Sequence, residues 1–208
     1  GTTSSLADRI AIASNNTHIT IGLSPQAIIN CNAGGDCNGG DPLGVYEYAY
    51  NHGIPEDSCQ NYEAKNPAQE LCSPEQVCKN CHYPPPNGTC NAITDFPKWY
   101  VSEFGGVFGV DAMKKAIYNN GPIGCGMDVT AKFETYSGGI YSEVKDNIEI
   151  NHEIAVVGWG QENGVDYWIG RNSWGTYWGE WGFFRMKMGS DNLGIETNCN
   201  WGIPIINN

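Results

Sequence analysis

Basic residues are scarce in this sequence, and long apolar runs are missing. The 208 residues include 11 Lys and Arg against 23 Asp and Glu, a formal net charge of −12 at pH 7. Binding to nucleic-acid phosphates needs a basic face, so we expect no nucleic-acid partner. No apolar run approaches the roughly 18 residues of a membrane-spanning helix. We therefore expect no membrane partner either.

Internal repeats and low-complexity tracts are also absent. Hydrophobic residues make up 40% and aromatic residues 12% of the chain. This is enough apolar material to bury a core, so the composition excludes an intrinsically disordered chain. The sequence opens at Gly1 without a methionine, and we expect a processed product or a fragment.

Cysteine, in contrast, is abundant. The chain has nine cysteines, and two N-glycosylation sequons begin at Asn15 and Asn87. Both features are typical of the secretory pathway, so we expect a lysosomal or secreted protein. The odd cysteine count leaves one thiol that is free, intermolecular or paired with something outside the sequence.

Composition divides the chain into two predicted domains, residues 1–97 and 98–208. The first carries seven of the nine cysteines. It also has helix signals: an apolar stripe over 6–11 and an N-cap residue followed by proline at 24–25 and 41–42. Residues 59–90 show little periodicity, and we expect disulfides to hold that segment.

The second part is predicted to be mainly antiparallel β-structure. One helix is expected over 111–119, followed by strands at 123–129, 139–142, 153–159, 167–171, 183–188 and 203–206. A helical half followed by a β half predicts an α+β fold, with the site in the cleft between the halves.

A histidine and an asparagine in the second part can form a catalytic pair. The separation of twenty positions from His152 to Asn172 fits a hairpin that turns at Asn163-Gly164, which would bring imidazole and amide side by side. We expect the amide oxygen to accept the proton of Nδ1, leaving Nε2 to face a nucleophile. The alternative is a buried histidine that merely satisfies a neighbouring carbonyl. Asp128, Glu153 and Asp166 have no partner at helix or strand spacing, and we assign them no role.

Four motifs resemble the papain family of cysteine peptidases and occur in the family's order. They are Cys37-Asn38-Gly39-Gly40, the stretch 152–160, Asn172-Ser173-Trp174-Gly175 and Trp178-Gly179-Glu180. Stretches at 52–55, 61–65 and 192–196 are similar to a lysosomal carboxypeptidase branch of that family. The resemblance implies a papain-like two-domain fold, a helical disulfide-rich domain beside an antiparallel β-barrel. It also implies a cofactor-free peptidase that acts on peptide or protein substrates through a Cys-His-Asn arrangement.

The resemblance also implies roles for individual residues. The catalytic pair would be His152 and Asn172, and the substrate-binding residues Gly39, Gly40, Trp174 and Trp178. The glycines would pair their backbone with the substrate, and Trp174 would cover the hydrogen bond of the catalytic pair. From local sequence alone, the glycines fit a loop beside a disulfide equally well, and the tryptophans fit core aromatics.

The family's nucleophile has no counterpart in this sequence. In the family it lies in a Cys-Gly-Ser-Cys-Trp segment, and aligning the stretch 7–10 with the helix that follows places the reactive cysteine about four residues before Gly1. We therefore expect this chain to be inactive alone. The alternatives are a catalytically inactive papain-fold protein with a binding or structural role, and a cysteine-rich binding module unrelated to proteolysis.

The disulfide pairing that the resemblance implies leaves one cysteine over. The pairs are Cys31–Cys72, Cys59–Cys78, Cys81–Cys90 and Cys125–Cys199, and the unpaired residue is Cys37. In the family, the cysteine at the position of Cys37 bonds to the nucleophile-bearing segment, so we expect Cys37 to tether an upstream segment. A zinc site formed by Cys78, Cys81, His82 and Cys90 is the alternative; we expect disulfides and no metal.

Overall fold

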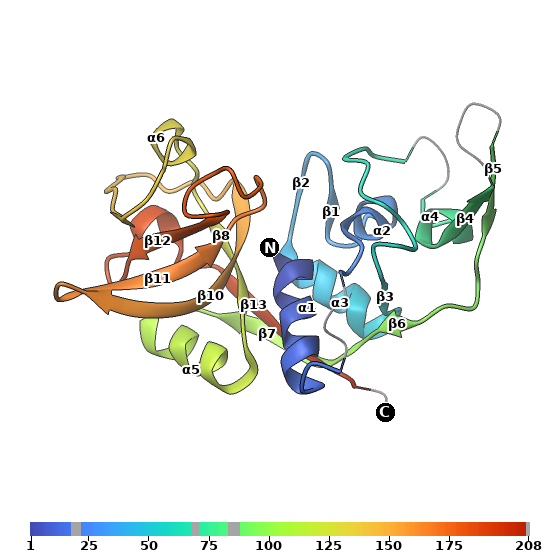
Figure 1. Cartoon of the computed structure of the whole chain (residues 1–208), viewed down its shortest axis with the longest axis horizontal. Helices are drawn as coiled ribbons and strands as arrows, with labels where there is room; N and C mark the ends of the chain where they lie inside the picture. The colour runs from blue at the N-terminus through green and yellow to red at the C-terminus, as the bar shows by residue number, and fades with distance from the viewer. Residues whose placement is uncertain (18–21, 68–70, 83–87, 207–208) are drawn as a thin grey trace.

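The computed structural model describes residues 1–17, 22–67, 71–82 and 88–206. These residues form a helical lobe and a β lobe (Figure 1). The prolines at 84–86 and the sequon residue Asn87 lie outside the described residues. Asn15 lies just after the first helix, is exposed and has a positive φ of 51°.

The helical lobe contains four helices and three two-stranded sheets. The helices are α1 (Thr2–Ala13), α2 (Pro25–Asn30), α3 (Pro42–Asn51) and α4 (Pro74–Val77). The sheets pair β1 (Gly35–Asp36) with β2 (Gly39–Gly40), β3 (Ile54–Pro55) with β6 (Lys98–Trp99), and β4 (Lys79–His82) with β5 (Thr89–Ala92). The core of the lobe is formed mainly by one face of α1 and α3, which supplies Leu6, Ile10, Tyr46 and Ala49, and it includes Ile54 of β3.

The predicted caps of α2 and α3 are confirmed. The hydroxyl of Ser24 accepts a hydrogen bond from the Ala27 backbone N–H at 3.1 Å, and the Asp41 carboxylate accepts one from the Leu43 N–H at 3.0 Å. Each cap is followed by a proline at the first helical position, where a missing N–H costs nothing. Asp41, the cap of α3, directly follows β2.

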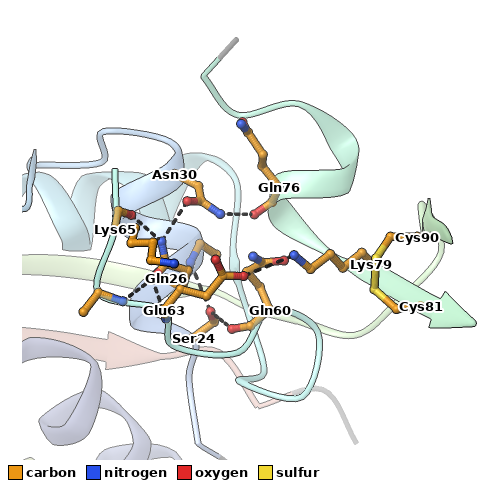
Figure 2. Close-up of polar contacts among 12 residues, drawn as sticks. Ser24, Gln26, Asn30, Gln60, Glu63, Lys65, Gln76, Lys79, Cys81 and Cys90 are labelled. Carbon is orange, nitrogen blue, oxygen red and sulfur yellow. Dashed lines mark hydrogen bonds and ion pairs between the residues drawn. A yellow bond between two sulfur atoms is a disulfide. The ribbon is translucent and has the colours of Figure 1, made fainter. Parts of the chain in front are cut away.

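Side-chain amides as well as disulfides hold the irregular segment that follows Cys59 (Figure 2). The side chain of Gln26 on α2 donates to the Lys65 carbonyl at 2.8 Å and accepts from the Glu63 N–H at 2.8 Å. Asn30, one turn later, donates to the Gln76 carbonyl at 2.8 Å. Because these buried amides replace the hydrogen bonds of regular structure, the segment is ordered without periodicity. Disulfides hold this segment as predicted, and the side-chain amides add to them.

The β lobe is a seven-stranded sheet in the order β7-β13-β8-β10-β11-β12-β9. Its strands are β7 (Val101–Val107), β8 (Ile123–Met127), β9 (Ile140–Tyr141), β10 (His152–Glu162), β11 (Val165–Arg171), β12 (Phe183–Lys187) and β13 (Cys199–Pro204). All pairings are antiparallel except that of β12 with β9. The remaining elements are α5 (Val110–Asn120), α6 (Ala131–Glu134) and the short 3₁₀ helix η1 (Asn192–Gly194).

Two strand predictions were wrong. The last strand begins at Cys199 rather than at residue 203, and β7 was not predicted. Two adjacent glycines, 105 and 106, weaken the strand signal of β7. The strand forms because it pairs along β13, where the Trp201 ring covers Gly105. Pairing between distant segments thus outweighs local propensity here.

Helix α1 joins the two lobes. It runs along the boundary between them (Figure 1) and packs against β13, β10 and β8. Its buried Arg9 donates hydrogen bonds to the carbonyls of Pro122, Gly202 and Gly121 at 2.6, 3.1 and 3.1 Å. The adjacent residue, Asp8, forms an ion pair with Arg171 of β11 at 2.6 Å. At the start of α1, the Thr2 hydroxyl donates a hydrogen bond to Glu153 of β10 at 3.3 Å, which holds this end of the helix beside the first residues of β10.

Candidate active site

The β10–β11 hairpin positions the predicted catalytic pair. His152 is the first residue of β10, and Asn172 follows the last residue of β11. The two strands are joined by Asn163 and Gly164, whose φ values of 51° and 79° are those of a two-residue type I′ turn. This turn sets the register that returns the chain from His152 to Asn172, as the sequence predicted.

The imidazole and the amide are hydrogen-bonded through Nε2, not through Nδ1. His152 Nε2 lies 2.8 Å from Asn172 Oδ1. The same oxygen accepts the Ser173 backbone N–H at 2.8 Å, which identifies it as the carbonyl oxygen of the amide. Nε2 must therefore carry the proton and donate it. The prediction that Nδ1 faces the asparagine was wrong, because the hairpin spacing brings the two side chains together but does not set the orientation of the imidazole ring.

Trp174 covers this hydrogen bond. Its ring centroid lies 5.0 Å from that of His152, with the planes tilted by 34°. Trp178 packs edge-on against Trp174 at 5.1 Å and donates from Nε1 to the Glu134 carbonyl at 2.8 Å. Trp178 is 7% exposed and belongs to the core of the β lobe. Trp178 therefore packs against Trp174 from the core of the β lobe, and it lines neither described cavity.

Burial dominates the electrostatics of His152. Burial lowers the pKa of its imidazole, and the hydrogen bond to Asn172 opposes that shift. The ring is therefore biased toward its neutral form, with the proton on Nε2. The other nitrogen, Nδ1, makes no hydrogen bond with any described residue and can exchange a proton with a group placed before it.

A cavity of about 930 Å³ lies beside His152 and is lined by both lobes. The wall from the β lobe includes Ile150, His152 and Asn198, and the wall from the helical lobe includes β2 and the start of α3. A site between two lobes is the usual place for a ligand that touches both. The cavity therefore lies between the two lobes, where the sequence analysis places the site.

The two predicted substrate-binding residues, Gly39 and Gly40, are glycines for different structural reasons. A Cβ at Gly40 would overlap with the Gly34 carbonyl, so close packing explains that glycine. A Cβ at Gly39 would meet nothing within 4 Å, yet its φ of 135° is one that other residues rarely adopt. Gly39 is exposed at the rim of the cavity, which leaves its backbone open to an extended ligand.

A second cavity, of about 940 Å³, adjoins the first. It is lined by the first residues of α1, by apolar residues of α2 and by Arg171 and Ser173. Thr2 and Glu153 are among the residues that line both cavities. The first turn of α1 therefore lies within the same hollow as His152.

The cysteines form four disulfides. They join Cys31 to Cys72, Cys59 to Cys78, Cys81 to Cys90 and Cys125 to Cys199, the four pairs that the family resemblance implies. Cys37 is free and exposed at the first cavity. Because the sulfurs of Cys78, Cys81 and Cys90 are used in these bonds, the zinc alternative does not hold.

Among the described residues, no His, Cys, Asp and Glu side chains gather in a metal-binding group, and no helix is long and apolar enough to span a membrane.

One residue at the cavities, Glu153, received no role from its sequence. It is the residue after His152 and contacts Thr2 on α1, where the Thr2 hydroxyl donates to Oε1 at 3.3 Å. A signal was present, because a carboxylate directly precedes the apolar run Ile154-Ala155-Val156 of a buried strand. A charged residue next to such a run indicates a side chain with a polar partner.

Comparison with known proteins identifies the class. Residues 1–203 match the family described as papain family cysteine protease, and the chain belongs to that family. A cathepsin B-like cysteine proteinase 6 of Caenorhabditis elegans is 33% identical to it, over 100% of this chain and 59% of that protein. The structure of proCathepsin B S9 from Trypanosoma congolense has a TM-score of 0.78 and 26% identity, covering 99% of this chain and 68% of that one.

Within the family, the chain is related to cathepsin Z. The cathepsin Z of Onchocerca volvulus is 45% identical over 214 residues, which cover 99% of this chain and 67% of that protein. The motifs at 52–55, 61–65 and 192–196 are similar to this branch of the family. The chain thus spans about two thirds of the length of this relative, and 59% of the C. elegans relative.

Proposed function

We propose that this protein hydrolyses peptide bonds as a cysteine peptidase in which His152 is the imidazole partner of the nucleophile and Asn172 orients it. The observation that carries the proposal is the 2.8 Å hydrogen bond between His152 Nε2 and Asn172 Oδ1. It holds the ring with Nδ1 free and directs that nitrogen toward a single partner. An asparagine in this place fixes the tautomer without adding charge to the site.

In this proposal the thiolate comes from a segment that precedes residue 1. The start of α1 supports this placement, because Thr2 lines the same cavity as His152 and contacts the next residue of β10. A thiol just before a helix start has a lowered pKa, since the helix dipole favours the thiolate. Free Cys37, at the rim of the cavity, would bond to a cysteine of that segment.

The chemistry follows from the positions of the two ring nitrogens. The thiolate attacks the peptide carbonyl while the imidazolium holds a proton on Nδ1. The tetrahedral intermediate collapses as Nδ1 protonates the leaving amine, and neutral His152 then removes a proton from the water that hydrolyses the thioester. Throughout, Asn172 keeps the ring plane in place through Nε2, and Trp174 excludes water from that hydrogen bond.

We further propose that the peptidase is a carboxypeptidase that is either lysosomal or secreted. The 45% identity to a cathepsin Z supports the specificity. Four disulfides and the two sequons support an oxidising, glycosylating compartment. Peptide or protein chains with a free C-terminus are therefore the proposed substrates.

Hydrolysis by the full-length protein tests this function. Short peptides with a free or an amidated C-terminus are incubated with the protein at pH 5, and the products are identified by mass spectrometry. We expect residues to be released from the free C-terminus only. His152→Ala should reduce kcat/KM by about 10³-fold or more, and Asn172→Ala by about 10- to 100-fold with KM little changed.

A matched control is His52→Ala, since His52 caps α3 far from the catalytic pair. That variant is expected to keep wild-type kcat/KM. Peptide binding without any cleavage by folded wild-type protein would contradict the proposal and favour a catalytically inactive papain-fold protein.

A further inference from the structure

Asp128 is a buried carboxylate that has no partner at helix or strand spacing in the sequence. It follows the last residue of β8, and its side chain is 2% exposed. Its backbone N–H donates to the Leu193 carbonyl at 2.8 Å, so the residue itself is fixed to the β lobe. A buried carboxylate is costly unless polar or charged partners surround it. The partners of Asp128 therefore show what this side chain holds.

All partners of the carboxylate among the described residues lie in one segment, residues 145–151. Lys145 Nζ forms an ion pair with Oδ2, and the Glu149 backbone N–H donates to the same oxygen at 2.9 Å. The Asn151 side-chain amide donates to Oδ1 at 3.4 Å. None of these three donors belongs to a strand. The carboxylate thus holds a single segment and not the sheet.

This segment has no regular structure of its own. β9 ends at Tyr141 and β10 begins at His152, and the structure, which describes every residue between them, has no helix or strand there. The backbone of the segment must therefore find hydrogen-bond partners elsewhere. The Glu149 N–H finds one at Asp128, and the Asn151 N–H finds one at the Met127 carbonyl at 3.1 Å. Both acceptors lie at the end of β8.

The segment leads directly into His152. The β8–β10 ladder ends at the pair of His152 with Met127. Asn151 and Asp128 are the next residues beyond that pair. Side chains continue the pairing there, because the Asn151 amide accepts from the Val129 N–H at 2.8 Å and donates to the Val129 carbonyl at 3.2 Å. Strand ends open more readily than strand centres, so the contacts beyond the ladder govern how firmly His152 is held.

The end of β8 is a firm anchor for these contacts. The Cys125–Cys199 disulfide ties β8 to β13 close to Asp128. Met127 is fully buried in the core of the β lobe. Lys145, in contrast, is 37% exposed and reaches the carboxylate from the solvent side. The ion pair therefore ties an exposed segment to a buried part of the sheet.

The electrostatics keep this carboxylate charged. Burial by itself raises the pKa of Asp128. The hydrogen bonds from the Glu149 N–H and from Lys145, together with the charge of Lys145, outweigh burial and lower the pKa below its ordinary value of 3.8. The carboxylate is therefore ionised at pH 5 as well as at neutral pH.

We propose that Asp128, together with Lys145, is a positioning residue for His152: the pair fixes residues 145–151 on the end of β8 and so keeps the imidazole in its hydrogen bond with Asn172. Neither Asp128 nor Lys145 lines a described cavity, so the effect reaches His152 through the segment. The inference rests on the proposed function for the catalytic role of His152, whereas the positioning itself concerns the folded protein.

The exchange of the His152 Nε2 proton with water tests the positioning. It is measured by proton–nitrogen NMR on the full-length protein labelled with nitrogen-15, at pH 6. The Nε1 proton of Trp178, which is bonded to the Glu134 carbonyl at 2.8 Å, is the internal reference for opening of the β lobe as a whole. In Asp128→Asn we expect the His152 proton to exchange about tenfold faster and the Trp178 proton to change less than twofold.

Two further variants and a control identify the residues responsible. Lys145→Gln changes an exposed residue, so it tests the ion pair even if Asp128→Asn does not fold, and it should speed the exchange at His152 about threefold or more. The double variant Asp128→Asn/Lys145→Gln should show less than the product of the two single effects, because neither charge then lacks its partner. Asp146→Asn makes the same charge change at an exposed position of the segment, where the carboxylate has no hydrogen bond with a described residue, and should leave the exchange unchanged.

The outcomes separate this inference from the proposed function. Unchanged exchange at His152, or an equal increase at His152 and Trp178, overturns the inference even if the wild-type protein cleaves peptides. A selective increase at His152 supports it even if the wild-type protein cleaves none, in which case only the peptidase proposal fails. With peptides that the wild-type protein cleaves, Asp128→Asn should lower kcat about tenfold with KM changed less than twofold, and an unchanged kcat overturns the inference.

Discussion

Two adjacent residues of β10, His152 and Glu153, illustrate what decides function at the scale of the residue. Successive side chains on a strand point to opposite faces. His152 is hydrogen-bonded to Asn172 and covered by Trp174, whereas Glu153 contacts Thr2 on α1. One strand end thus supplies both the imidazole that we propose to be catalytic and a carboxylate at the lobe boundary.

The pH dependence of stability should reveal Glu153. Its folded-state pKa of about 7 lies above the ordinary value of 4.5. The stability that its neutral form contributes is therefore fully present below about pH 4.5 and lost as the pH rises through 7. Replacing it by Gln removes this loss, so Glu153→Gln should be more stable than wild type at pH 8 by about 2 kcal/mol, with little difference at pH 4.

Urea unfolding at both pH values measures this difference. Glu47→Gln, which removes the same charge from an exposed position on α3, serves as the control, and we expect its stability relative to wild type to be the same at pH 4 and pH 8. A Glu153→Gln protein whose stability relative to wild type does not change between the two pH values would mean that the carboxyl has the same pKa in the folded and unfolded states.

At the scale of the element, the β10–β11 hairpin matters most, because it carries His152 and Asn172, the proposed catalytic pair, at its two ends. Its turn has Gly164 at a φ of 79°, and its far end has Gly170 packed against the buried ring of Phe184. The two glycines are required for different reasons. One is needed for backbone conformation and the other for space.

Alanine substitutions should separate these reasons. A Cβ at Gly164 would meet nothing within 4 Å, so Gly164→Ala should cost only the backbone strain, about 1 kcal/mol of unfolding free energy. A Cβ at Gly170 would overlap with Phe184, and Gly170→Ala should cost about 2–3 kcal/mol. Denaturant unfolding followed by tryptophan fluorescence tests the order, and equal costs would contradict it.

At the scale of the whole molecule, buried Arg9 holds the two lobes together. Its guanidinium donates to three backbone carbonyls of the β lobe while its helix packs in the helical lobe. Removing it would leave those carbonyls buried without donors. Arg9→Met should therefore lower the unfolding free energy by about 3 kcal/mol or more.

The ion pair of Asp8 with Arg171 offers a matched comparison on the same helix. Both side chains are partly exposed, so Asp8→Asn should cost less than about 1 kcal/mol. Both variants are measured by thermal unfolding at pH 6. A loss for Asp8→Asn as large as that for Arg9→Met would show that the boundary depends on the exposed pair and not on the buried arginine.

The sequence by itself determined the features that depend on local chemistry. The caps at Ser24 and Asp41, the turn at Asn163-Gly164 and most of the strands of the β lobe follow from residue type and spacing. Short motifs determined the family, because a few side chains with fixed spacing carry its chemistry.

Only the tertiary structure decided the features that depend on packing between distant segments. It determined that Nε2 of His152 faces Asn172, that Trp178 lies in the core and that β7 is a strand. It also placed Glu153 with Asp41 at one cavity, although 111 residues separate them in the chain (153 − 41 − 1). Such proximity is set by how the lobes close on α1, and no local pattern encodes it.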